Sequence, residues 1–90
     1  MKKRAHIYFD GRVQGVGFRF TAEYIAREMN VVGWAKNLPD GRVEVVAEGE
    51  QDSLNEFIDR IKTRMKRYIS DEILDWEEYK GEFNSFGMRF

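Results

Sequence analysis

Hydrophobic and polar residues alternate over residues 5–11, where Ile7 and Phe9 fall on one side of an extended chain. This period of two predicts a half-buried strand. Over residues 20–29 the apolar positions follow helical spacing instead, which predicts a helix whose apolar face would carry Phe20, Tyr24, Ile25 and Met29. Asn30 follows this segment and can end a helix in the left-handed conformation.

The central part of the chain predicts a hairpin and a second helix. Residues 31–37 and 42–48 have strand-like patterns, and residues 38–41 between them read Leu-Pro-Asp-Gly. Proline presets φ and glycine accepts the left-handed position, so this tetrapeptide is typical of a turn. Further along, Ser53 and Glu56 have the spacing of a capping box that would open a helix.

The remaining pattern completes the fold. The apolar face of the second helix would consist of Leu54, Phe57, Ile58, Ile61 and Met65. Residues 72–79 predict a fourth strand and residues 85–90 a short fifth one. The order predicts an α+β fold, a ferredoxin-like βαββαβ sandwich in which an antiparallel sheet carries two helices on one face. No repeat or linker interrupts the pattern, so we expect a single domain over residues 1–90.

Composition narrows the function classes. A net charge of −1 provides no global field that would attract nucleic acid, and the absence of cysteine excludes disulfides, thiolate metal sites and a cysteinyl-phosphate intermediate. The apolar stretch after the basic N-terminal residues is interrupted by His6 and Asp10 and is too short for export or for a membrane span. We therefore expect a cytoplasmic protein. His6, the single histidine, lies on the polar side of its strand and is expected on the open sheet face.

The segment between the first strand and the first helix is rich in glycine. Gly11, Gly15 and Gly17 allow positive φ angles, so that consecutive backbone N–H groups can turn inward and form an anion site. The helix that follows adds unpaired N–H donors, and Arg19 at its start can offer a bidentate guanidinium fork to a phosphate. The predicted phosphate-binding residues are Val13, Gln14, Gly15, Val16, Gly17, Phe18 and Arg19. A tight strand-to-helix turn would also use glycines.

Two familiar phosphate loops do not fit this segment. A Walker A loop ends in Gly-Lys-Ser/Thr, which is missing, and a Rossmann loop needs an acidic residue on a second strand to reach a ribose, for which this short chain has no clear equivalent.

Residues 11–19, Gly-Arg-Val-Gln-Gly-Val-Gly-Phe-Arg, resemble the signature of the acylphosphatase family. A second family block is similar to residues 33–37 (Gly-Trp-Ala-Lys-Asn) followed by the turn and residues 41–49, and residues 86–90 are similar to the closing Phe-x-x-Arg-aromatic. The resemblance covers essentially the whole chain. It implies the same ferredoxin-like fold and the hydrolysis of a small-molecule acyl phosphate to a carboxylate and inorganic phosphate.

The resemblance also implies residue roles. Arg19 and the loop would hold the phosphate, and Asn37 would hold the attacking water; these two are the expected catalytic residues. The terminal carboxylate of Phe90 would pair with Arg19 and orient it. Leu38 stands where many relatives carry threonine, which removes a hydroxyl beside Asn37 and is expected to lower the rate.

The chemistry of the candidate residues agrees with this substrate. The loop, one arginine and one asparagine include no general acid, metal ligand set or nucleophile. Without a general acid or a metal ion, the alkoxide of a phosphate ester would be a poor leaving group. A carboxylate, whose conjugate acid has a pKa of about 4, departs unprotonated at neutral pH. We therefore expect an acylphosphatase that needs no metal or cofactor. We also expect it to be a monomer without a nucleic-acid or membrane partner.

Other interpretations remain open from the residues alone. Arg19 could be a surface ion-pair residue, and Asn37 could only stabilise the turn that follows it. RNA-recognition modules share the βαββαβ order, but Glu44 and Glu48 on the open face would repel phosphates. A non-catalytic anion-binding domain would need Arg19 without Asn37. The signature also opens a larger hydrogenase-maturation factor, a context not expected for a chain of 90 residues.

Overall fold

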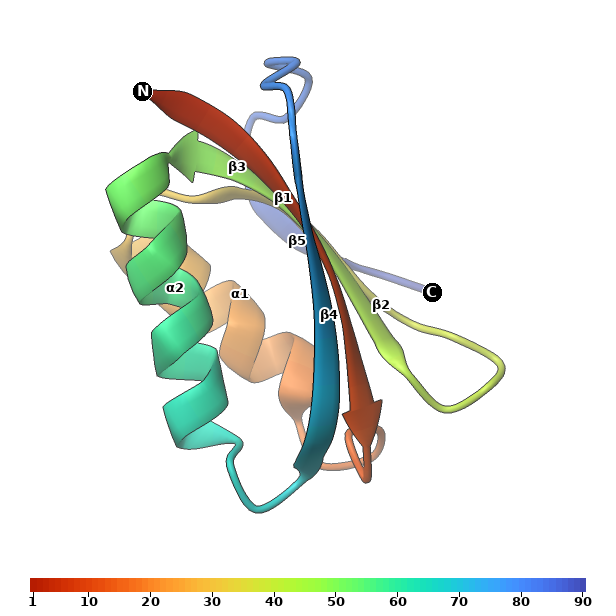
Figure 1. Cartoon of the computed structure of the whole chain (residues 1–90). Coiled ribbons are helices and arrows are strands. Elements are labelled where there is room, and N and C mark those ends of the chain that lie inside the picture. Colours follow the sequence, from red (N-terminus) through yellow and green to blue (C-terminus); the bar gives the residue numbers. More distant parts are fainter.

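The computed structural model describes residues 1–90 and contains two helices and five strands. In chain order these are β1 (Lys2–Gly11), α1 (Phe18–Glu28), β2 (Val32–Asn37), β3 (Val43–Glu50), α2 (Gln51–Arg64), β4 (Ile69–Glu77) and β5 (Phe86–Arg89). The strands form one sheet, and both helices cover the same face of it (Figure 1). Neither helix is long and apolar enough to cross a bilayer.

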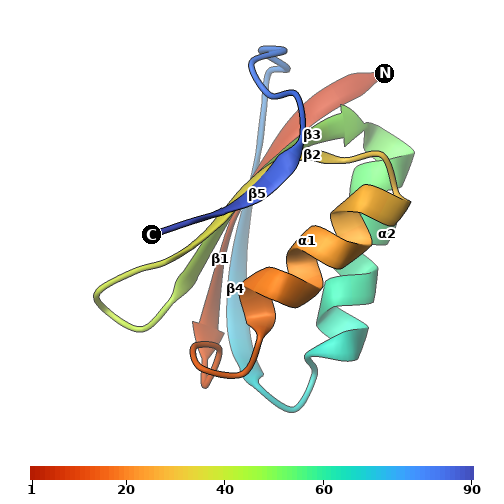
Figure 2. The same cartoon turned by 180° about the vertical axis from the view of Figure 1, so that it is seen from behind.

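The strand order in the sheet is β4-β1-β3-β2-β5. β1 pairs antiparallel with β3 and β4, and β2 pairs antiparallel with β3, which confirms the predicted ferredoxin-like sandwich. The short fifth strand runs parallel to β2, with Gly33 opposite Phe86 and Lys36 opposite Arg89, so the complete sheet is mixed. Figure 2 shows β5 at the sheet edge on the side of α1.

The core lies between the helices and the sheet. Alternate residues of β1 and β3, such as Ile7 and Val45, point toward the helices and are fully buried together with Phe57 of α2. They belong to one cluster of 19 buried hydrophobic residues. Each large side chain buried in this way contributes about 1.5–3 kcal/mol to folding. The Phe57 ring also packs edge-on against Phe86, which fastens β5 to the same core.

The predicted apolar face of α1 is correct only in part. Ile25 is buried and Met29 packs against the core, but Phe20 and Tyr24 are 65% and 51% exposed. The residues that α1 buries are Phe18, Ala22, Ile25 and Ala26, which share one side of the helix. At 100° per residue, Phe20 and Tyr24 fall on the opposite side, so the predicted face combined residues from two sides of the helix. Two large aromatic side chains are therefore left at the surface.

The predicted start of α2 is wrong. The helix begins at Gln51 rather than at Ser53, and its N-cap residue Glu50 makes no side-chain capping hydrogen bond. β3 continues to Glu50 and passes directly into the helix, while the Gln51 N–H donates to the carbonyl oxygen of Met1 at 3.0 Å. The N-terminal end of β1 thus satisfies a donor that a capping box would have served, and Ser53 falls within the first turn.

β4 begins earlier than the predicted residues 72–79. It spans Ile69–Glu77 because Gly11 pairs with Ile69 across an irregularity in the register. A Cβ on Gly11, whose φ is +126°, would lie 2.2 Å from the carbonyl oxygen of Tyr68. β4 is an edge strand with no buried residue, so its sequence lacks the alternation that would mark its bounds.

Gly33 has a packing reason for being glycine. Its φ is +143°, and a Cβ at this position would lie 1.9 Å from the carbonyl oxygen of Val46 in the neighbouring strand. The turn at residues 38–41 forms as predicted, with φ +97° at Gly41 and a hydrogen bond from its N–H to the Leu38 carbonyl. Together, Gly33 and the turn hold β2 close to β3.

The open face of the sheet carries a network of charged groups. His6 lies there, as predicted, with its Nε2 2.6 Å from a carboxylate oxygen of Glu44. Glu48 is fully buried beneath the β4–β5 connection, where it accepts hydrogen bonds from the N–H groups of Lys80 and Gly81 at 2.7 and 3.1 Å. Arg4 also donates to Glu48. This network fixes the connection that leads into β5.

Candidate functional site

The glycine-rich loop connects the end of β1 to the start of α1. Gly15 and Gly17 have φ angles of +76° and +77°, in the left-handed region that glycine tolerates. A Cβ on either residue would meet no atom within 4 Å, so the requirement for glycine is conformational and the space beside the loop is open. This backbone shape is the one that the sequence predicted for an anion site.

The N-terminus of α1 adds donors to the loop. Gly17 is the N-cap residue, and no side chain caps this end of the helix. The first helical hydrogen bond runs from the Thr21 N–H to the Gly17 carbonyl, so the N–H groups of Phe18, Arg19 and Phe20 have no helical partner. Free N–H groups and the partial positive charge of a helix N-terminus are a favourable environment for a phosphate.

Arg19 is positioned by the last strand. Its Nη1 donates to the carbonyl oxygen of Arg89 at 2.9 Å, and its guanidinium carbon lies 4.7 Å from the centre of the Phe90 ring. The predicted ion pair with the terminal carboxylate of Phe90 is absent, because the backbone carbonyl and the ring occupy this side of the guanidinium instead. A guanidinium has five N–H donors, so this contact leaves others for a ligand.

Asn37 lies at the end of β2, opposite Val43 of β3. It faces the same cavity as the loop and Arg19. This cavity has a volume of about 160 Å³ and is lined by Val13, Gly15, Gly17, Phe18, Arg19, Phe20, Asn37 and Met88. The structure therefore brings both expected catalytic residues together with much of the predicted loop, whereas Gln14 and Val16 do not line the cavity.

Gln14 does not line the cavity and contacts the β2–β3 hairpin instead. Its Nε2 donates to the carbonyl oxygens of Leu38 at 2.7 Å and of Arg42 at 3.0 Å. Leu38 and Arg42 are themselves joined by a backbone hydrogen bond of 2.8 Å. Gln14 thus ties the glycine-rich loop to the hairpin that carries Asn37, a contact that the spacing in the sequence does not reveal.

The hairpin beside Asn37 is held by its own ion pair. Asp40 accepts hydrogen bonds from the backbone N–H of Arg42 at 3.1 Å and from its Nε at 2.8 Å, and both interactions lower the pKa of the Asp40 carboxyl below its ordinary value. The Arg42 guanidinium also lies 4.6 Å from the centre of the Tyr8 ring. Arg42 is therefore engaged with its neighbours and does not line the cavity, whereas Arg19 does.

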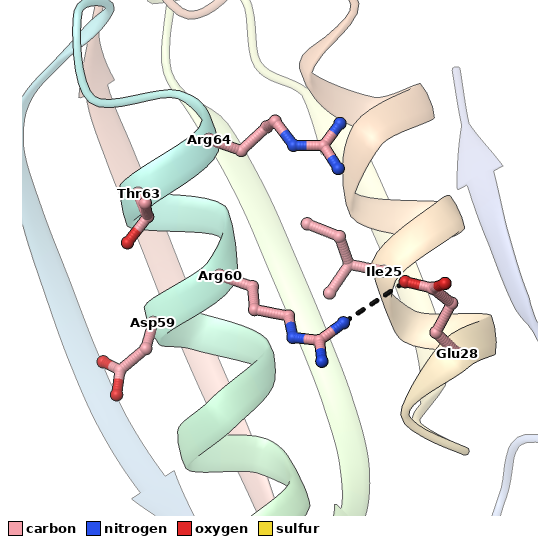
Figure 3. A pocket seen from close by; sticks show the side chains of 6 residues that line it. All are labelled: Ile25, Glu28, Asp59, Arg60, Thr63 and Arg64. Atoms are coloured by element: carbon pink, nitrogen blue, oxygen red, sulfur yellow. Dashed lines mark hydrogen bonds and ion pairs between the residues drawn. The ribbon is translucent and has the colours of Figure 1, made fainter.

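A larger concavity of about 590 Å³ lies between the two helices, lined by Ile25, Glu28, Asp59, Arg60, Thr63 and Arg64 (Figure 3). Arg60 reaches across it from α2 to Glu28 of α1 at 3.2 Å and also pairs with Glu56 at 2.9 Å. None of the predicted site residues lies there. Glu28 and Asp59 would also repel an anion in this concavity, whereas no Asp or Glu lines the smaller cavity, which is therefore the better candidate for an anionic ligand.

The sequence reasoning missed two residues of the cavity. Phe20 was expected in the core of the protein, and Met88 was assigned only to a short strand. Both line the cavity and both are exposed, to 65% and 36%. For Phe20 the available signal was the phase of the helix, since Phe18 and Ala22 fall on its buried side and Phe20 on the opposite side.

Comparisons with known proteins agree with one another. The family model described as Acylphosphatase matches residues 5–88. A protein of Caldanaerobacter subterraneus subsp. tengcongensis named acylphosphatase is 44% identical over 87 residues, which cover 96% of this chain and 97% of that one. The crystal structure of acylphosphatase from Bacillus subtilis is 32% identical and superposes with a TM-score of 0.89 over all of both chains. HypF of T. kodakarensis, at 31% identity and a TM-score of 0.83, aligns with 98% of this chain but with only 12% of its own length.

Proposed function

The chain belongs to the acylphosphatase family and is an enzyme that hydrolyses acyl phosphates, and we propose that Arg19 and Asn37 carry out this reaction in the cavity beside the glycine-rich loop. The observation that carries the proposal is the convergence of three elements on one cavity: the loop, the start of α1 and the end of β2. Each contributes a different kind of group. The loop offers backbone N–H groups, α1 offers a guanidinium and β2 offers an amide.

In the proposed mechanism the loop and Arg19 bind the phosphoryl group. Its three outer oxygens carry the negative charge, and in this proposal the N–H groups of residues 15–19 and the guanidinium stabilise that charge. Phosphoryl transfer needs little covalent help from a protein and depends mainly on positioning and charge stabilisation. The contact of Arg19 with the Arg89 carbonyl supports this role, because it fixes the guanidinium at the cavity.

Asn37 holds the attacking water in the same proposal. Its amide can accept a hydrogen bond from the water and donate another to it, but it cannot remove a proton. As the water oxygen bonds to phosphorus, the bond from phosphorus to the acyl oxygen breaks and its electron pair leaves with the carboxylate. The proton of the water passes to a phosphoryl oxygen of the substrate. A carboxylate with a conjugate acid pKa of about 4 needs no general acid to leave.

Inorganic phosphate, the product, provides the direct test of the binding site. Titration of the protein with inorganic phosphate, followed by backbone amide NMR, is expected to shift the amides of Gly15, Gly17 and Arg19 most strongly, because these N–H groups would donate to the ligand. The basic segment at the end of α2, with Arg64 and Arg67, serves as an internal comparison. If its amides moved most and those of the loop stayed in place, the proposed cradle would be wrong.

Gln14 supplies a second test, because it reaches the hairpin and not the cavity. We expect Gln14→Ala to lower kcat for benzoyl phosphate about tenfold, since a misplacement of about 1 Å can reduce rates up to about 100-fold. Loss of the two hydrogen bonds should also lower the free energy of unfolding by about 1–2 kcal/mol. Steady-state kinetics and chemical denaturation measure the two effects. A changed affinity for phosphate at unchanged kcat would instead assign Gln14 to the phosphate site.

The finer statements about partners and location stay predictions from the sequence. These are the monomeric state, the cytoplasmic location, the single-domain organisation and the independence from metals and cofactors. The family establishes only the class of substrate, a small-molecule acyl phosphate.

A further inference from the structure

Two apolar side chains border the phosphate cavity and are left exposed by the rest of the protein. Phe20 extends from the first turn of α1, and Met88 lies on β5 beside Ala35 of β2. They line the cavity from two different elements. The other apolar residues of the same cavity are covered, as in Val13 at 0% and Phe18 at 2% exposure, so Phe20 and Met88 are the apolar side chains that this cavity leaves accessible.

The chemistry of this mouth differs from that of the proposed phosphate cradle. A phenyl ring and a thioether offer no strong hydrogen-bond donor to a phosphate, and a phosphate gains little from lying against them. What they can contact favourably is the apolar part of a ligand, since burial of apolar surface is the main gain available to such side chains. No Asp or Glu lines the cavity to attract a cationic group.

We infer that Phe20 and Met88 form a subsite for the acyl group and give the enzyme a preference for acyl phosphates with large apolar acyl groups, such as benzoyl, over small ones. The inference rests on the proposed position of the phosphoryl group in the loop. With the phosphate held there, the acyl group extends toward the mouth of the cavity and covers the exposed faces of the two side chains. Small acyl groups such as acetyl are too short to cover them.

The test compares two substrates, benzoyl phosphate and acetyl phosphate, in variants of Phe20 and Met88. For Phe20→Ala we expect kcat/KM to fall about tenfold for benzoyl phosphate, the lower end of the range for apolar pocket contacts. The value for acetyl phosphate should stay unchanged, since that substrate does not use the ring. Phe20→Leu, which restores an apolar side chain, should recover most of the benzoyl phosphate activity. Met88→Ala should shift the ratio of the two substrates in the same direction.

Tyr24→Ala is the matched control. Tyr24 is an exposed aromatic residue on the same helix and does not line the cavity, so its removal should leave the activity ratio unchanged. A Phe20→Ala variant with an unchanged ratio would overturn the acyl subsite, whether both activities persist or both fall in parallel. Failure of the proposed phosphate site is distinguishable, because it would appear as full activity of Arg19→Ala on both substrates. Thermal unfolding of each variant checks that the fold is intact.

Discussion

Replacement of Arg19 by alanine is expected to lower kcat for benzoyl phosphate about 10³-fold or more, as arginines do in other phosphoryl transfers. Such a loss corresponds to about 4 kcal/mol of transition-state stabilisation. The physical reason is that Arg19 is the cationic side chain of a cavity that otherwise offers backbone N–H groups and one amide. Binding of inorganic phosphate should weaken together with the rate, because the guanidinium would contact the phosphoryl oxygens before and during the reaction.

Two further variants sharpen this expectation. Arg19→Lys keeps the charge but loses the planar fork that also contacts the Arg89 carbonyl. Its kcat should therefore lie between that of Arg19→Ala and that of the unmodified enzyme. Arg27→Ala removes an arginine from the last turn of the same helix, where it pairs at the surface with Glu23, and should have no effect on turnover. A kcat for Arg19→Ala equal to that of Arg27→Ala would refute the role of Arg19.

Replacement of Asn37 by alanine is expected to separate binding from turnover. The rate should fall about 10²–10³-fold, the usual effect of losing one well-placed polar group in a reaction that develops charge. The affinity for inorganic phosphate should stay near that of the unmodified enzyme, since the loop and Arg19 remain. Measurement of kcat with benzoyl phosphate and of the competitive inhibition constant of inorganic phosphate provides both quantities from one assay.

Replacement of an asparagine outside the cavity controls for a general effect of removing a side-chain amide. Asn84 is exposed in the connection before β5 and does not line the cavity, so Asn84→Ala should retain both rate and phosphate inhibition. If phosphate affinity and kcat fell in parallel in Asn37→Ala, the asparagine would be part of the phosphate cradle, and its proposed role with the water would be wrong. Retention of full activity would favour the interpretation in which Asn37 only stabilises the turn.

The sequence predicts the elements whose information is local. The alternation over residues 5–11 reveals β1, and the glycine pattern reveals a loop whose φ angles at Gly15 and Gly17 are confirmed. The convergence of Arg19 and Asn37 also follows from the order of elements, because both residues lie at the same end of the sheet. The first two features depend on residue type and spacing within a few positions along the chain. The third depends on the shared direction of β1 and β2, which both pair antiparallel with β3.

The sequence does not predict features that depend on contacts between distant segments. The start of α2 is set by the backbone of Met1, and the position of Gln14 by two carbonyl oxygens of the hairpin. Backbone carbonyls have the same chemistry in every residue, so no sequence motif marks them as partners. The exposure of Phe20 is a different case, because helical periodicity places it opposite the buried residues Phe18, Ala22 and Ile25, and the prediction chose the wrong phase of the helix.

The contact between Arg19 and the Arg89 carbonyl joins residues that are 70 positions apart, and it has a consequence for the order of folding. Closing so long a loop has a larger entropic cost than forming a helix turn or a hairpin, and contacts of this kind form slowly. The bend of the glycine-rich loop and the start of α1 can form from neighbouring residues. The guanidinium acquires its direction only when β5 has joined the edge of β2. Catalytic competence is thus acquired only once the long-range pairings of the sheet have formed, after the helix turns and the β2–β3 hairpin.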